Sequence, residues 1–83
     1  GIDVADIACG AGRAVCEMAR LFPASRFTGM DFSAEAIVSA RREAQRLGLP
    51  NALFECTDVA EVRGSYDLVT AFGNWLFTRT VNL

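Results

Sequence analysis

Glycine and aspartate residues lie where apolar segments of the sequence end, and their spacing is suited to binding a ligand. Gly10 and Gly12 follow the apolar run 4–8. Glycines at such a turn either serve the turn alone or allow a ligand to lie against bare backbone. Asp31 comes 19 residues after Gly12, and its carboxylate can accept both hydroxyls of a ribose. The pattern therefore indicates either a simple turn or a site for a dinucleotide or another adenosine ligand.

Residues near this pattern refine the choice of ligand. Phe32 is either a base-stacking residue or a core or partly exposed aromatic residue. Asp58 can accept a hydrogen bond from an adenine amino group, although a loop aspartate taken alone more often caps the next turn. A dinucleotide fingerprint requires a small residue three positions after Gly12, where Val15 stands. The bulk of Val15 therefore disfavours NAD and FAD.

The elements that must position these residues alternate between strands and helices. Apolar runs predict strands at 4–8, 26–31, 53–56 and 66–71. Helical spacing of apolar residues predicts helices over 13–22, ended by Pro23, and over 34–47, with Ser33 as N-cap and Gly48 at the end. Residues 58–65 are expected to form a loop with room for one helical turn.

This order of elements predicts an α/β fold with a Rossmann-like, doubly wound parallel sheet. Helical crossovers join parallel strands, and their handedness places the helices on the faces of the sheet. Ligands of such sheets bind outside the carboxyl ends of the strands. The segments expected at those ends, and therefore along one crevice, are 8–12, 31–33, 57–59 and 71–73.

Composition and charge exclude several classes of protein. The 83 residues make at most one domain, and the chain opens on an apolar run without Met, so we expect a piece of a longer protein. No stretch approaches ~20 apolar residues, so no membrane span is expected. Three cysteines without a C-x-x-C pair, and no histidine, disfavour metal and disulfide sites and favour the cytoplasm. The net charge of −2 disfavours a nucleic-acid partner.

Taken together, the ends of the predicted strands resemble the motifs of class I S-adenosylmethionine-dependent methyltransferases. The resemblance lies in Asp6-Ile7-Ala8-Cys9-Gly10-Ala11-Gly12, Gly29-Met30-Asp31-Phe32-Ser33, Asn51-Ala52-Leu53-Phe54-Glu55-Cys56-Thr57-Asp58 and Tyr66-Asp67-Leu68-Val69. In that family these correspond to the glycine-rich first motif and to the motifs of the second, third and fourth strands. The resemblance covers residues 2 to about 73, and it is specific because the motifs occur together in order.

The resemblance implies a site for the methionine end of S-adenosylmethionine at the first turn. The backbone of Cys9, Gly10 and Gly12 would pass close to the cofactor, and Asp6 would help to orient its amino group. Ala8 is a departure, because the family has a glycine at this position. The added methyl group is a small intrusion on the cofactor.

The resemblance also implies contacts with the adenosine part of S-adenosylmethionine. Asp31 would hold the ribose hydroxyls, and Phe32 would flank the adenine. Asp58 would accept from the adenine amino group, with the backbone of Val59 beside it. The cofactor is a cation without phosphate groups, so acidic residues at the strand ends suit it better than a phosphate-binding loop would.

The family has a seven-stranded sheet, of which this chain would supply the first four strands. Residues 1–73 would form the cofactor-binding half of the domain, with Ala71 and Phe72 near the sulfonium. Residues 74–83 have no family pattern and stay unassigned, as a short helix, a strand or a non-native end. The edge of the fourth strand would then be open, which predicts self-association of the chain through that edge.

The function implied by the resemblance is methyl transfer to an unidentified acceptor, as part of a longer enzyme. The isolated chain is expected to be inactive, and no residue is an evident general base, so no catalytic residue is assigned. A small-molecule acceptor is favoured over nucleic acid because the chain is mildly acidic. The alternatives are a fragment of an NAD-dependent oxidoreductase and a non-catalytic binding module with a methyltransferase-like fold.

Overall fold

The boundaries of the strands and helices follow the turn residues of the sequence. The computed structural model describes residues 1–71 and 76–82. In chain order the elements are β1 Asp3–Ile7, α1 Arg13–Leu21, β2 Arg26–Asp31, α2 Ala34–Leu47, β3 Ala52–Cys56, the 3₁₀ turn η1 Val59–Glu61, β4 Ser65–Ala71 and β5 Leu76–Asn82. The first four strands and both helices match their predicted ranges to within about one residue at each end. Within the described residues, no helix is long and apolar enough to cross a membrane.

The ends of α2 are formed by the residues that the sequence predicts. Ser33 Oγ accepts a hydrogen bond from Ala36 N at 3.2 Å, so Ser33 is the N-cap. Gly48 has a left-handed backbone with φ of 66°, and its N–H donates to the carbonyl oxygens of Ala44 and Gln45. Only Phe32 and Ser33 separate the end of β2 from the start of α2.

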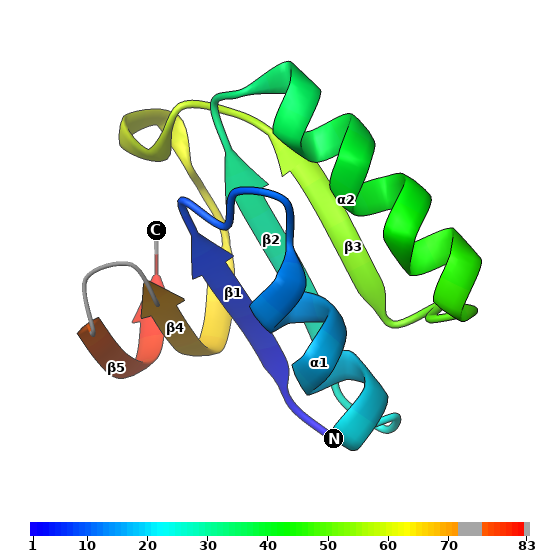
Figure 1. Cartoon of the computed structure of the whole chain (residues 1–83). Coiled ribbons are helices and arrows are strands. Elements are labelled where there is room, and N and C mark those ends of the chain that lie inside the picture. The colour runs from blue at the N-terminus through cyan, green and yellow to red at the C-terminus, as the bar shows by residue number, and fades with distance from the viewer. Residues whose placement is uncertain (72–75, 83) are drawn as a thin grey trace.

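The sheet has the strand order β3-β2-β1-β4-β5, with β1 to β4 parallel and β5 antiparallel to β4. β2 and then β3 are added on the same side of β1. Right-handed connections between these strands therefore place both helices on the same face of the sheet, as Figure 1 shows. The next strand, β4, joins the opposite side of β1. The order therefore reverses at β1, and ligands of such sheets bind beside this switch point.

Apolar side chains cover both faces of the sheet, but by different means. On the helical face, Val4 and Phe54 pack with Val15 of α1 and Ile37 of α2. The opposite face has a smaller cluster, formed by Ala5, Met30, Val62 and Val69. Val62 comes from the segment between η1 and β4, which covers the far side of the central strands. β1 and β2 are thus buried on both faces, whereas β3 exposes Leu53 and Glu55 on the far face.

The prediction that the fourth strand has an open edge is wrong. Residues 76–82 form β5, which pairs with β4 along its length from Ser65 to Ala71. An antiparallel neighbour needs only a short connection, so the residues after β4 can turn back and fill its hydrogen-bonding edge. The edges of the sheet are therefore β3 and β5. The predicted boundary after residue 73 lies beside residues 72–75, outside the described part of the chain.

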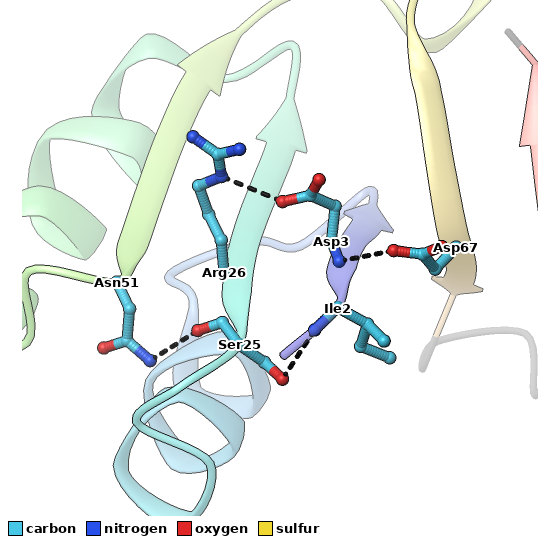
Figure 2. Close-up of polar contacts among 6 residues, drawn as sticks. All are labelled: Ile2, Asp3, Ser25, Arg26, Asn51 and Asp67. Carbon is cyan, nitrogen blue, oxygen red and sulfur yellow. Dashed lines mark hydrogen bonds and ion pairs between the residues drawn. The ribbon is translucent and has the colours of Figure 1, made fainter.

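Polar contacts fasten the amino-terminal ends of the parallel strands (Figure 2). Asp3 accepts from Arg26 Nε at 2.9 Å, and the Asp3 N–H donates to Asp67 Oδ2 at 2.8 Å. Ile2 N donates to Ser25 Oγ at 3.1 Å. The Asn51 amide donates to the carbonyl oxygen of Ser25 at 2.9 Å. These contacts join the starts of β1, β2, β3 and β4, at the opposite end of the sheet from the glycine turn.

Candidate cofactor site

The carboxyl ends of β1, β2 and β3 meet at one edge of the sheet and are joined by backbone hydrogen bonds. Cys9 N donates to Met30 O at 2.9 Å, which connects the turn after β1 to β2. Thr57 N donates to Asp31 O at 2.9 Å, which connects the end of β3 to β2. The segments predicted to line one crevice are therefore neighbours at the edge where parallel sheets bind ligands.

Asp31 is the polar centre of this edge. Its Oδ2 accepts a hydrogen bond from Gly10 N at 2.9 Å, and its Oδ1 accepts from Ser33 N at 2.9 Å. The residue is only 8% exposed. Each carboxylate oxygen can accept two hydrogen bonds, so this group retains acceptor capacity for hydroxyl donors such as those of a ribose. The Asp31 carboxylate thus links the glycine turn to the start of α2 through hydrogen bonds, and it places a negative charge at the strand end.

The two glycines of the turn have different roles. Gly12 has φ of 78°, and a Cβ added there would lie 2.5 Å from Phe54 Cε1 and 2.9 Å from Ala40 Cβ. Gly12 therefore serves the close packing of the turn against β3 and α2. Gly10 has φ of 58°, and an added Cβ would meet nothing within 4 Å. Gly10 borders open space, which is what a ligand lying against bare backbone requires.

Ala8 has the same backbone conformation as the glycines, with φ of 55°. An L-residue with a Cβ is strained in this left-handed region, and such strain often marks a functional turn. The turn thus alternates left-handed residues at 8, 10 and 12. Ala8, which stands where the resembling family has a glycine, therefore has the conformation that glycine would adopt freely.

Cys9 lies in the turn with its side chain partly buried. Burial, and then the nearby carboxylates of Asp6 and Asp31, raise the pKa of the Cys9 thiol to about 12. The thiol is therefore neutral at physiological pH and is not a nucleophile. The carboxylates of Asp6 and Asp31 thus disfavour a further negative charge at the turn.

Asp6 is buried on β1, directly below the turn. It is 3% exposed, and its Oδ1 accepts a hydrogen bond of 2.7 Å from Thr70 Oγ1 on β4. The sequence analysis selected Asp6 but missed Thr70. A hydroxyl residue inside the otherwise apolar end of the fourth strand was the available signal, because a buried polar group needs a hydrogen-bond partner.

Phe32 and Asp58 differ in how firmly the structure holds them. Phe32 is 80% exposed beside Asp31, so its ring is accessible to a ligand. Asp58 is exposed, and its Oδ1 accepts from Ala60 N at 2.9 Å. Its backbone oxygen accepts from Glu61 N at 2.8 Å. Asp58 therefore caps η1, the role that a lone loop aspartate most often has, and contact with adenine stays a prediction.

The remaining predicted residues lie at two strand ends. Val59 is the first residue of η1, directly after Asp58. Ala71 is the last residue of β4 and is buried. Phe72 lies outside the described residues. The structure thus brings the glycine turn, Asp31 and Phe32 together, with Asp58 and Ala71 at the ends of the flanking strands.

A family model described as a methyltransferase domain matches residues 4–82. The chain belongs to this family. Its residues 1–71 and 76–82 contain the α/β, Rossmann-like sheet predicted from the sequence. The methyltransferase domain also includes β5, for which the sequence analysis found no family pattern.

Curated relatives of the methyltransferase domain have different acceptors in their names. The chain is 39% identical to trans-aconitate 2-methyltransferase of Deinococcus radiodurans over 80% of its own length and 24% of the relative. It is 33% identical to tRNA (guanine-N(7)-)-methyltransferase of Rubrobacter xylanophilus over 69% of its length and 26% of the relative. The chain therefore spans about a quarter of the length of these relatives.

A solved structure supports the same family. Magnesium protoporphyrin IX methyltransferase from Synechocystis PCC 6803, with bound S-adenosylhomocysteine, is 28% identical to the chain. It matches with a TM-score of 0.75 over 83% of this chain and 32% of that one. The similarity covers most of the methyltransferase domain described above.

One hollow of the methyltransferase domain lies away from the strand ends. It has a volume of about 690 Å³ and lies along the outer edge of β3, beside α2. Arg41 lines it and donates to Phe54 O at 2.8 Å from Nη2. Arg41 thereby occupies a carbonyl of the edge strand, so this hollow is a shielded sheet edge and is separate from the glycine turn.

Proposed function

We propose that this chain binds S-adenosylmethionine and that the whole protein transfers the methyl group of this cofactor to an acceptor. The observation that carries the proposal is the Asp31 carboxylate, held at the end of β2 by N–H groups of Gly10 and Ser33. A carboxylate at this position suits a ligand with hydroxyl donors and a positive charge. A dinucleotide also places a ribose at such a carboxylate, so the choice between the two cofactors depends on other residues.

The adenosine part is assigned to the ends of β2 and β3. Asp31 accepts from the ribose hydroxyls, and exposed Phe32 lies along one face of the adenine. The carboxylate of Asp58 accepts from the adenine amino group through the oxygen that does not cap η1, with the Val59 backbone beside it. The Asp58 oxygen that caps η1 is Oδ1, which accepts from Ala60 N, so Oδ2 is the oxygen assigned to the adenine.

The methionine part is assigned to the turn after β1. Open space at Gly10 and the negative potential of Asp6 and Asp31 favour an ammonium group there. When bound, S-adenosylmethionine supplies a methyl group on a positively charged sulfur. The residues proposed to line this part are Asp6, Ala8, Cys9, Gly10, Gly12 and Ala71, with Phe72 outside the described residues.

The acceptor is proposed to be a small molecule. The mildly acidic charge of the chain favours this class, and one of the relatives above is named for a small organic acid whereas another is named for tRNA. No catalytic residue is proposed, since the chain spans about a quarter of these relatives and contains no evident general base. We expect the isolated chain to bind the cofactor without turnover, and we expect the protein in the cytoplasm.

An NAD-dependent oxidoreductase is the competing function. The third glycine of a dinucleotide fingerprint allows a helix to pack closely on a strand. Val15 occupies that position and is fully buried between α1 and the sheet. The packing at this position is therefore that of a bulky core residue, which supports S-adenosylmethionine over NAD.

Amide NMR spectra of the chain with S-adenosylhomocysteine, with NAD and with neither ligand test the proposal. We expect the signals of Gly10, Gly12, Asp31 and Asp58 to shift with S-adenosylhomocysteine alone. Shifts with NAD alone would support the oxidoreductase. Dispersed spectra that respond to neither ligand would contradict cofactor binding. Binding by the whole protein, without methylation of any acceptor in a metabolite extract, would support the non-catalytic module.

A further inference from the structure

The side chains of Thr70 and Asp6 form a buried polar pair in the centre of the sheet. Asp6 and Thr70 are register partners on the parallel strands β1 and β4. The Thr70 hydroxyl donates to Asp6 Oδ1 at 2.7 Å, and the two residues are 1% and 3% exposed. The Thr70 oxygen also lies 3.5 Å from Ala5 O. One hydroxyl proton serves one strong bond, and the shorter contact is the one to the carboxylate.

The Asp6 carboxylate of this pair lies near the glycine turn, so its negative charge acts on the turn. Asp6 is the penultimate residue of β1, so only Ile7 separates it from the turn. Its carboxylate, like that of Asp31, contributes to the raised pKa of the Cys9 thiol. A buried carboxylate keeps its charge only when donors stabilise it. A neutral donor such as the Thr70 hydroxyl stabilises the anion without itself adding a compensating charge.

We propose that Thr70 is a positioning residue whose hydroxyl keeps the Asp6 carboxylate oriented and charged for the ammonium group of the cofactor. The inference rests on the proposed function and assigns a role to a residue of β4 that does not itself need to touch the ligand. If Thr70 has this role, loss of its hydroxyl weakens binding of the ammonium group of the ligand and leaves binding of the adenosine unchanged.

A pair of ligands separates this role from a purely structural one. S-Adenosylhomocysteine carries the ammonium group, whereas 5′-methylthioadenosine shares the adenosine and the sulfur but lacks the amino-acid part. Both bind only the folded chain, so partial unfolding lowers both apparent affinities by the same factor. The ratio of the two affinities therefore reports on the contacts of the amino-acid part, which carries the ammonium group.

Isothermal titration of the full chain and of Thr70→Val with each ligand is the experiment. Valine keeps the shape of threonine and removes the donor. We expect Thr70→Val to weaken S-adenosylhomocysteine about tenfold or more, the scale of a charge-assisted hydrogen bond. Its affinity for 5′-methylthioadenosine should stay within a factor of about two. Thr70→Ser keeps the hydroxyl and should restore the ratio of the unmodified chain.

Thr28→Val is the matched control, because Thr28 is a buried threonine of β2 whose side chain lines the opposite face of the sheet. Its affinity ratio should equal that of the unmodified chain. Thr70→Ala is a second hydroxyl-free variant for the case in which Thr70→Val does not fold. An equal loss for both ligands, or no loss for either, would overturn the positioning role. If the unmodified chain bound neither ligand, the proposed function itself would fail.

Discussion

The backbone N–H of Gly10 and the Oδ2 atom of Asp31 lie 2.9 Å apart, although 21 positions separate them in the sequence. This bond joins the turn after β1 to the end of β2. The other oxygen of the same carboxylate holds the N–H of Ser33 at the start of α2. A single side chain therefore connects the glycine turn, the strand end and the helix start.

Replacement of Asp31 by alanine should weaken both the fold and the site. Gly10 N and Ser33 N would lose a partly buried acceptor, so the free energy of unfolding should fall by ~1–3 kcal/mol. The binding free energy of S-adenosylhomocysteine should weaken by ~1–3 kcal/mol through lost bonds to ribose. Urea denaturation and isothermal titration measure the two effects. Glu55→Ala removes an exposed carboxylate of β3 and should change neither. Unchanged affinity in a folded Asp31→Ala variant would refute the assignment.

Replacement of Ala8 by glycine should stabilise the chain. Its φ of 55° costs an L-residue ~1–2 kcal/mol, whereas glycine adopts it freely at an entropic cost of ~0.5–1 kcal/mol. The net gain expected in urea denaturation therefore lies between about 0 and about 1.5 kcal/mol. Ala11→Gly in the same turn is the control, because Ala11 has no positive φ to relieve and should lose stability. A lower stability for Ala8→Gly than for Ala11→Gly would contradict this account.

Alanine at the two glycines of the turn should separate packing from binding. Gly12→Ala places a methyl group 2.5 Å from the Phe54 ring and should unfold the chain or lower its thermal midpoint sharply. Gly10→Ala meets no atom within 4 Å, so its cost is limited to backbone strain of ~1–2 kcal/mol. A folded Gly10→Ala should still lose affinity for S-adenosylhomocysteine, because its methyl group enters the space assigned to the ligand. Circular dichroism and titration distinguish the two, and equal stability of the variants would disprove the packing role of Gly12.

The three cysteines should react with iodoacetamide in a fixed order. Cys56 is exposed, Cys9 is partly buried and Cys16 is buried, and all are free thiols. Mass spectrometry at pH 8 should find Cys56 alkylated first and Cys9 protected, since the pKa of Cys9 is raised to about 12.

An unfolded thiol ionises near ~8.5. The unfolded chain therefore binds fewer protons, and the contribution of Cys9 to stability declines as pH rises from about 8.5 to 12. Alkylation of Cys9 before Cys56 would contradict the prediction.

Asn51 should matter for stability and leave binding unchanged. Its amide nitrogen donates to the carbonyl oxygens of Ala19, Phe22 and Ser25, at 3.0, 3.2 and 2.9 Å. Asn51→Ala should lower the free energy of unfolding by ~1–3 kcal/mol. The affinity of the folded fraction for S-adenosylhomocysteine should not change, because these contacts lie at the far end of the sheet. Gln45→Ala removes an exposed amide and serves as the control. A specific loss of affinity in Asn51→Ala would show that the two ends of the sheet are coupled.

The sequence predicted most of the fold because local signals and long-range packing agree in it. Gly48 and Ser33 bound α2 where their backbone preferences place them. The antiparallel strand β5 was not predicted, because its pairing with β4 depends on a neighbour that no local pattern specifies.

The site was predicted less completely than the fold. Strand-end chemistry identified Asp31 and the glycine turn, but which backbone groups Asp31 would hold depends on the relative placement of β1, β2 and α2. The Thr70–Asp6 bond spans 64 positions, and spacing along the chain carries no information on such a contact. The distinct roles of Gly10 and Gly12 likewise required the positions of Phe54 and Ala40.

The central position of β1 has a consequence for biosynthesis. Among the described strands β1 comes first in the chain, yet its second edge is filled only by β4, whose residues come more than sixty positions later. Until then a nascent chain exposes the unpaired backbone of the strand that will become the middle of the sheet, and such an edge readily pairs with other chains. Closing this long loop is slower than forming a hairpin. The architecture that places Asp6 beneath the turn therefore exposes newly made chains to aggregation until β4 is complete.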